Sequence, residues 1–218
     1  AAFTSTRVMA TCAVVGQAAG TAAAQCIQEE IAPRQLAQDT KRVWALQQAL
    51  LRDDQSLRGF RNEDPKDLAR QAKVSASGAE PANPAEKVLD GFVRDIPGKE
   101  THQWAGRMGP DGAWIELKWD RSVRISEVQL TFDTGFQREL TLSSSDGVMK
   151  GIVRGPQPET VKDYQLFAGD REIASQSANH QRLRRHQFAA VTTDRLRIHV
   201  TATNGSDLAR VFEIRCYG

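Results

Sequence analysis

The spacing of apolar side chains changes along the chain, from a helical pattern in the first part to an alternating pattern in the second. Between Val8 and Ile27 the small and apolar residues share helical faces, which predicts one long helix. Apolar residues between Val43 and Leu50 follow the i, i+3, i+7 spacing of another helix, expected over about residues 40–52. Asp39 or Thr40 is suited to cap its N-terminus.

Two prolines mark further helix starts in this first part. Pro33 and Pro65 each fit the first turn of a helix, where the missing N–H group costs nothing. A short helix is therefore expected over residues 66–71, after the polar turn that ends at Pro65. The helical pattern ends near residue 72.

After Lys73 apolar and polar residues alternate one by one, which is typical of strands with a single buried face. The alternation is clearest over residues 114–119, 128–133 and 196–201, and turn sequences separate these segments. No long helical pattern lies between them, so we expect a mainly β fold, an antiparallel jelly-roll-like sandwich preceded by a short helical segment. Further strands are expected at residues 140–144, 164–168, 187–190 and 211–217.

The composition fits a globular domain and gives no sign of a nucleic-acid partner. Hydrophobic residues make up 40% of the chain and charged residues 26%, enough for a packed core. The net charge of +2 is too small to indicate nucleic-acid binding. The basic cluster at residues 182–186 is interpreted as a solvated strand end or loop.

The three cysteines, Cys12, Cys26 and Cys216, do not form a disulfide framework. Cys12 and Cys26 would lie about 21 Å apart on one helix, so they cannot pair without breaking it. The cysteines therefore leave the compartment open, and a bacterial, periplasmic or extracytoplasmic location is favoured.

Residues 8–27 could also be taken for a signal peptide or a membrane span, and we favour neither. The segment consists mostly of Ala, Gly and Thr, and it contains Gln17 and Gln25, whereas a span needs about 20 strongly apolar residues. A signal peptide would be removed from the mature protein. Since the chain begins with Ala-Ala-Phe, we expect it to be part of a longer protein.

Bulky side chains are nearly absent between Gly16 and Ala24. A glycine inside a helix costs roughly 1 kcal/mol relative to alanine, so a close neighbour is needed to explain Gly16 and Gly20. One candidate is a tightly packed helix or strand. The other is a cofactor lying against the N-terminus of the helix, where unpaired N–H groups attract anionic groups.

The segment Gly16-Gln17-Ala18-Ala19-Gly20-Thr21-Ala22-Ala23 resembles the C-terminal cofactor-binding motif of bacterial FAD-dependent oxidoreductases, some of which carry xanthan-lyase names. A stretch similar to Arg7–Thr11 precedes the motif in that family, and the resemblance continues to Asp64-Pro65. It implies that the positions facing a flavin are Arg7, Gly16, Gln17, Ala18 and Ala19. The alternative is that the glycines only allow close helix packing.

The chain lacks the other half of such a cofactor site. FAD binding in that family also needs an N-terminal βαβ unit with a G-x-G-x-x-G turn, and the sequence contains no such turn. We therefore expect FAD to bind in the parent protein and not to this chain alone. The expected partner is the missing FAD-binding part, or a second copy through the helical segment, because an exposed apolar helix favours association.

Residues from about 74 to 218 resemble the galactose-binding-like, or discoidin, fold. The resemblance rests on Lys87–Gly91, Trp104, Trp114–Leu117 and Arg210–Arg215, in that order. Many members hold a structural calcium, and the matching positions here are Asp90 and Glu213, with Thr101 as a guess for a loop oxygen. The alternative is a hydrogen-bonded Asp-Gly turn and an ordinary glutamate.

Members of this fold also bind sugars through aromatic and basic side chains on loops at one end. Candidates of these types are His102, Trp104, Arg107, Phe136 and Arg138. Trp104 could instead belong to the core, and Phe136 could simply close a loop.

No independent catalytic motif is present, because the histidines lack metal-binding spacing and no C-x-x-C or G-x-S-x-G occurs. The sequence therefore predicts two parts, residues 1–72 from the end of an FAD-binding domain and residues 73–218 as a galactose-binding-like sandwich. The predicted function is a catalytically incomplete C-terminal fragment of an FAD-dependent oxidoreductase with an accessory sandwich. The alternative is a carbohydrate-binding or adhesion module with a helical linker.

Overall fold

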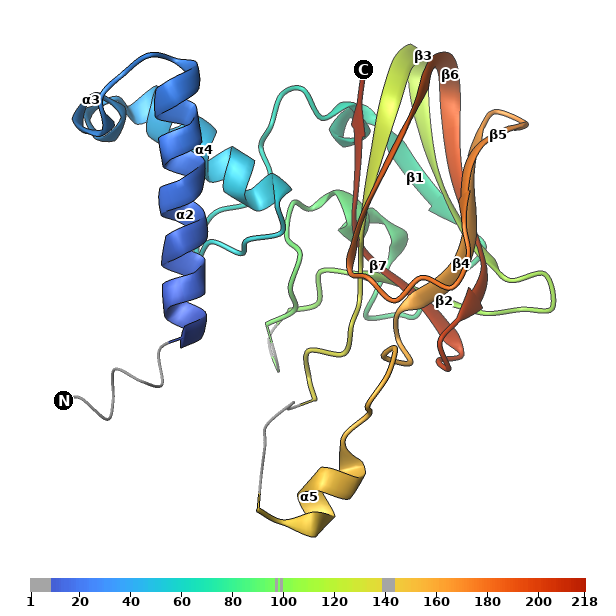
Figure 1. Ribbon diagram of the computed structural model, residues 1–218. Coiled ribbons are helices and arrows are strands. Elements are labelled where there is room, and N and C mark those ends of the chain that lie inside the picture. Colours follow the sequence, from blue (N-terminus) through green and yellow to red (C-terminus); the bar gives the residue numbers. More distant parts are fainter. Residues whose placement is uncertain (1–8, 97, 99, 139–143) are drawn as a thin grey trace. The chain divides into compact units, whose positions relative to one another are not determined.

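The computed structural model describes residues 9–96, 98, 100–138 and 144–218. Its contacts divide the chain into two compact units, Ala1–Asp64 and Pro65–Gly218, and each is described by itself (Figure 1). Residues 65–72, which the hydrophobic pattern assigned to the helical part, belong to the second unit because the short helix they contain packs on the last strand of the sandwich.

The helical unit contains α2 (Met9–Gln28), α3 (Pro33–Gln38) and α4 (Thr40–Arg52). Its two longer helices agree with the predicted ones, and Pro33 begins α3. The Asp39 carboxylate caps α4 by accepting hydrogen bonds from the backbone N–H groups of Lys41 and Arg42. The three helices pack on one another and bury Cys26, Leu36, Leu50 and Leu51.

The second unit is the β-sandwich, with two short 3₁₀ helices and one short α-helix in its connections. Its elements are η1 (Leu68–Gln71), β1 (Lys73–Ala76), η2 (Ala85–Leu89), β2 (Trp104–Arg107), β3 (Ala113–Phe132), α5 (Asp146–Gly151), β4 (Val161–Ala168), β5 (Arg171–Gln176), β6 (Leu183–Thr203) and β7 (Leu208–Tyr217).

All strands pair antiparallel in the order β2-β7-β3-β6-β4-β5, with β1 added along β3 (Figure 1). The two long strands belong to both layers. The first half of β3 pairs with β1 and with residues 195–200 of β6, and its second half pairs with β7 and with residues 183–187 of β6. The predicted antiparallel sandwich is confirmed, and its core is lined by buried side chains that include Ile115, Leu117, Leu130, Leu166 and Ile198.

Several elements differ from the sequence-based expectation. The predicted strands at residues 114–119 and 128–133 form one strand, because the polar residues between them carry β3 from one layer to the other across a register shift. Strand β5 and helix α5 were not predicted, since β5 lies between the Gly169-Asp170 turn and a Ser-rich segment, and α5 begins with Asp146-Gly147, residues typical of loops. The expected strand at 140–144 lies almost wholly outside the described residues. Within the described part, none of the helices is apolar enough over sufficient length to cross a membrane.

Candidate ligand-binding site

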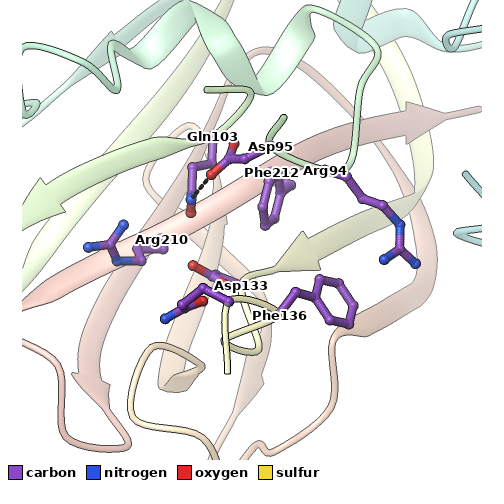
Figure 2. A pocket seen from close by; sticks show the side chains of 8 residues that line it. Arg94, Asp95, Gln103, Asp133, Phe136, Arg210 and Phe212 are labelled. Carbon is purple, nitrogen blue, oxygen red and sulfur yellow. Dashed lines mark hydrogen bonds between the residues drawn. The ribbon is translucent and has the colours of Figure 1, made fainter. Parts of the chain in front are cut away.

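A pocket of about 300 Å³ lies beside strands β2 and β7, bordered by the chain segments near residues 94–95 and 133–137 (Figure 2). This volume is at the lower end of the range for small-molecule sites. Its lining combines aromatic, cationic, acidic and amide side chains, namely Arg94, Asp95, Gln103, Asp133, Phe136, Gln137, Arg210 and Phe212. The site is therefore suited to a small polar ligand with one apolar face.

The pairing of β2 with β7 decides which side chains reach the pocket. Trp104 is opposite Val211 in the register, and both are fully buried in the core. Because alternate residues point to opposite faces, Gln103 and Arg210 project from the outer face. In β7 the register with β3 shifts from Glu213 to Val211, which leaves Phe212 in a bulge. A bulge of this kind re-aims a side chain, and here it adds Phe212 to the pocket wall.

Stacked aromatic and guanidinium groups form one wall of the pocket. The Phe136 ring is 52% exposed, and the guanidinium carbons of Arg94 and Arg182 lie 4.4 Å and 4.6 Å from its centroid. Arg182 also lies 4.8 Å from the centroid of Phe212 and donates a hydrogen bond to the Phe132 carbonyl at 2.7 Å. These cation–π contacts hold the aromatic wall in place before a ligand arrives.

Gln103 presents a buried amide oxygen that has no hydrogen-bond partner in the described part of the chain. Its Nε2 group donates to Asp95 Oδ2 at 2.7 Å, as Figure 2 shows, and the same carboxylate accepts the His102 backbone N–H at 2.7 Å. These bonds fix the amide so that its oxygen is directed away from Asp95. The residue is 4% exposed, and Oε1 has no hydrogen-bond partner among the described residues. Buried polar atoms are normally hydrogen-bonded, so this oxygen is a candidate to accept a bond from a ligand.

Arg210 is the corresponding donor. Its Nε atom is buried and has no acceptor, and Arg210 forms no ion pair within the described part of the chain. The carboxylates in the pocket are already engaged: Asp95 accepts two hydrogen bonds, and Asp133 accepts the Gly135 backbone N–H at 2.8 Å. An unsatisfied guanidinium N–H group beside an unsatisfied amide oxygen indicates a ligand that both accepts and donates hydrogen bonds.

A second cluster, formed by Asp90, Phe92 and His102, is connected to the pocket through Asp95. The Asp90 carboxylate accepts the Phe92 backbone N–H at 2.9 Å and lies 2.7 Å from His102 Nδ1. Burial raises the pKa of Asp90, and the hydrogen bond to His102 opposes that rise. The His102 ring lies against Phe92, with their centroids 4.6 Å apart. This cluster fixes the backbone at His102, whose N–H group in turn holds Asp95.

In the helical unit, α2 has an exposed surface that includes its glycines. A Cβ atom built on Gly16 or Gly20 would meet nothing within 4 Å, so none of the described residues packs closely against these glycines. Cys26 is the buried residue of this helix, whereas Met9 and Val15 are 78% and 60% exposed. The small-residue surface of α2 is therefore open to a partner.

Residues 1–50 match the family model described as FAD dependent oxidoreductase, and residues 67–155 match that of a domain of unknown function. The sandwich has the fold of solved carbohydrate-binding modules. One is a mutant of chitosan-binding module 1 from a Paenibacillus sp. IK-5 chitosanase/glucanase, at 17% identity and a TM-score of 0.51, covering 70% of this chain and 98% of that one. The chain therefore combines a segment that matches the FAD-dependent oxidoreductase model with a β-sandwich that has the fold of these modules.

Two further structures share the galactose-binding-like fold. The family 32 module of NanJ from C. perfringens, in complex with galactose, has a TM-score of 0.51 at 14% identity, covering 69% of this chain and 96% of that one. A mutant of the lectin binding domain of lectinolysin, complexed with Lewis b, has a TM-score of 0.50 at 14% identity, covering 71% of this chain and 96% of that one. No curated protein matches the chain.

Of the residues that the sequence suggested for sugar binding, some line the pocket and others lie elsewhere in the sandwich. Phe136 lines the pocket, but Trp104 is fully buried and donates its indole N–H to the Gly78 carbonyl at 2.9 Å. His102 is buried in its contact with Asp90 and is not among the lining residues, and Arg107 pairs with Asp207 and Glu80 at the surface, also outside the lining. Arg138 pairs with Glu159 and contributes to a different hollow.

Sequence reasoning missed most of the residues that form the pocket, including Asp95, Gln103 and Arg210. Their types are ordinary on a protein surface, and they come from segments far apart in the chain. Arg210 did appear in the closing-strand motif, but only the strand register shows that it shares a face with Gln103.

The residues matched to a calcium site already have partners in the sandwich. Asp90 is bound to Phe92 and His102, Glu213 lies 2.6 Å from Arg215 Nε, and the Thr101 hydroxyl donates to the Ala82 carbonyl. Among the described residues no group of three or more His, Cys, Asp or Glu side chains is placed to hold a metal ion. Calcium binding stays a prediction, and this arrangement fits protein hydrogen bonds better than a calcium cage.

We expect chelation to leave the stability of the sandwich unchanged, because its acidic side chains at these positions bind protein groups. The melting temperature with EDTA should equal that without it, as measured by differential scanning fluorimetry. A fall that added Ca²⁺ reverses, while Mg²⁺ does not, would favour the calcium interpretation instead.

In the oxidoreductase segment, the positions implied to face a flavin are Gly16, Gln17, Ala18 and Ala19 on α2, while Arg7 lies outside the described residues. Gly16 has open surroundings, and apart from Gln17 these residues have small side chains, so their role toward a flavin stays a prediction. The other side would have to come from the missing part of the parent, because the sequence contains no phosphate-binding turn.

Replacing Gly16 or Gly20 with alanine is expected to stabilise α2 in this chain by about 1 kcal/mol each, because the added methyl group meets no atom. The measurement is urea unfolding followed by circular dichroism. The matched control is Ala19→Gly on the same exposed helix, which should destabilise by a similar amount. A loss of stability in Gly16→Ala would instead show that another group presses on the helix.

Proposed function

We propose that the galactose-binding-like sandwich binds a carbohydrate in the pocket beside β2 and β7, as an accessory module of an FAD-dependent oxidoreductase. One observation carries this proposal: two buried polar atoms without a partner, Gln103 Oε1 and Arg210 Nε, line the same pocket as the exposed ring of Phe136. A monosaccharide offers hydroxyl groups that both donate and accept, together with an apolar C–H face.

The two kinds of contact complement each other. A sugar hydroxyl can donate to Gln103 Oε1 while another ligand oxygen accepts from Arg210 Nε, so both buried groups become satisfied. The edge or face of Phe136 would cover the C–H surface of the ring. Because Asp95 and Arg182 already hold the amide and the ring in place, binding orders few side chains, which favours affinity.

The fold comparisons support this ligand class. The solved modules with the same fold are described as chitosan-binding, as bound to galactose, and as complexed with Lewis b. Their identities are low, so they support the choice of carbohydrate and not of a particular sugar.

The helical unit is proposed to complete the FAD-binding part of the parent protein. When FAD is bound in that parent, it supplies the redox chemistry. This chain contributes the small-residue surface of α2, and the expected partner is the remaining FAD-binding part. The alternatives are self-association through α2, or a carbohydrate-binding or adhesion module in which the helices only link domains.

The carbohydrate proposal is tested by screening the chain on a glycan array and measuring the hits by isothermal titration calorimetry. Phe136→Ala and Gln103→Ala should each weaken binding, by about tenfold or more for the loss of a buried contact. Arg107→Ala is the matched control, since Arg107 is exposed and lies outside the pocket lining. Array hits whose affinity is unaffected by both pocket variants would place sugar binding elsewhere, and an array without hits would contradict the proposal.

A further inference from the structure

The charge balance of the pocket points to a more specific ligand class, and this inference rests on the proposed carbohydrate function. Three guanidinium groups, at Arg94, Arg182 and Arg210, border the pocket or its aromatic wall. They face two carboxylates, Asp95 and Asp133, which N–H donors of the protein already engage. The three guanidinium groups outnumber the two carboxylates by one, so an excess of one positive charge lies around the pocket.

The cations of the pocket differ in what they already bind. Arg182 donates to the Phe132 carbonyl, and Arg94 lies against the Phe136 ring. The Arg210 guanidinium has neither an ion pair nor a hydrogen bond within the described part of the chain, and its Nε is buried although the residue is partly exposed. Leaving a buried N–H group of a cation without an acceptor is unfavourable, and a carboxylate compensates for this more strongly than a neutral hydroxyl group does.

The size of the pocket suits one sugar ring. Arg210 is opposite Ala105 on β2, and Gln103 immediately precedes that strand. Both side chains line the same pocket of about 300 Å³, which has room for one pyranose ring with its substituents.

We propose that the pocket binds an acidic sugar, a uronate, whose carboxylate pairs with Arg210 while one of its hydroxyl groups donates to Gln103 Oε1. The N–H groups of Arg210 recognise the carboxylate. Gln103 recognises a hydroxyl that acidic and neutral sugars share. Arg210 therefore determines the preference for the acid, whereas Gln103 contributes to the affinity for both.

The test compares matched sugars that differ only at C6: galacturonate with galactose, glucuronate with glucose, and mannuronate with mannose. Binding to the full chain is measured by isothermal titration calorimetry at low and high salt. In at least one pair the acid should bind about tenfold more tightly than the neutral sugar, and the advantage should shrink as salt rises. This comparison uses the wild-type chain and needs no variant.

Two variants test whether Arg210 causes the preference for the acidic sugar. Arg210→Gln should remove the advantage of the acid and weaken the neutral sugar less than the acid, because the amide can still donate a hydrogen bond but carries no charge. Gln103→Leu should weaken both sugars of a pair alike. Arg107→Gln is the control for the loss of one positive charge outside the pocket, and it should alter neither. Melting temperatures of all three variants establish that they fold.

The outcomes separate this inference from the proposed function. A neutral sugar that binds as tightly as its acid, or an acid preference that survives Arg210→Gln, overturns the inference and leaves carbohydrate binding intact. If no member of any pair binds and the glycan array also gives no hit, both fail. An acid preference that is lost in Arg210→Gln and kept in Arg107→Gln supports it.

Discussion

Replacing Trp104 with alanine is expected to destabilise the sandwich by about 3–5 kcal/mol. The side chain is fully buried between the layers, and its removal would leave a large cavity in the core. The change would also leave the Gly78 carbonyl without the indole donor that now lies 2.9 Å away. The indole ring is tightly packed, because a methyl group built on Gly106 would lie only 2.2 Å from it.

The free energy of unfolding should be measured by urea denaturation followed by far-ultraviolet circular dichroism. Trp104→Phe keeps most of the ring and should cost less, about 1–2 kcal/mol for the lost hydrogen bond and volume. Trp114→Ala is the matched control on the outside of β3, where the ring lies beneath Arg197 and is partly exposed. An equal loss of stability in Trp114→Ala would contradict the assignment of Trp104 to the core.

The second large effect is expected at Asp67, which connects the start of the sandwich to its last strand. Its carboxylate accepts hydrogen bonds from the backbone N–H groups of Ala69 at 3.1 Å and of Cys216 at 2.9 Å, and the residue is 2% exposed. Asp67→Ala would leave both donors without this acceptor in a buried region, which we expect to cost about 2–4 kcal/mol. The short helix η1 would also lose its N-cap.

Asp67→Asn is the conservative variant, because the amide keeps one oxygen that can accept the same bonds, and its loss should be clearly smaller. Asp207→Ala serves as the control for removing a surface carboxylate, since Asp207 is 75% exposed in its pair with Arg107 and should contribute little. The midpoints of urea unfolding rank the three variants. If Asp67→Ala unfolds at the midpoint of the wild-type chain, residues 65–72 do not contribute to the sandwich as described.

The Asp67 variants also test where the boundary between the helical unit and the sandwich lies. The hydrophobic pattern placed the boundary at residue 72, since residues 66–71 have helical character. In the structure that segment packs on β7, and Trp119 donates its indole N–H to the Leu68 carbonyl at 2.7 Å. A sandwich that begins at residue 73 should therefore be less stable than one that begins at residue 65, by an amount comparable to that of Asp67→Ala.

Local sequence patterns were sufficient to predict those helices and strands that are determined by residues close together in the chain. The i, i+3, i+7 spacing and the cap at Asp39 identified α4, and the alternation around Ile115 and Ile198 identified the strands of the core. The resemblance of the Gly16–Ala23 segment agrees with the FAD-dependent oxidoreductase model that matches residues 1–50, and the resemblance of the later strands agrees with the fold of the solved carbohydrate-binding modules. These features depend on residues near one another in the sequence, where helix and strand geometry impose a fixed period.

The pocket depended on contacts between distant segments, and only the folded chain shows them. The register of β2 against β7 sets Gln103 and Arg210 on one face, and the bulge in β7 turns Phe212 toward the same pocket. The same pairing places Trp104 in the core, although its type had made it a sugar candidate. A shift of one residue in a strand register would reverse these faces without changing the hydrophobic composition, so the site was decided by tertiary pairing.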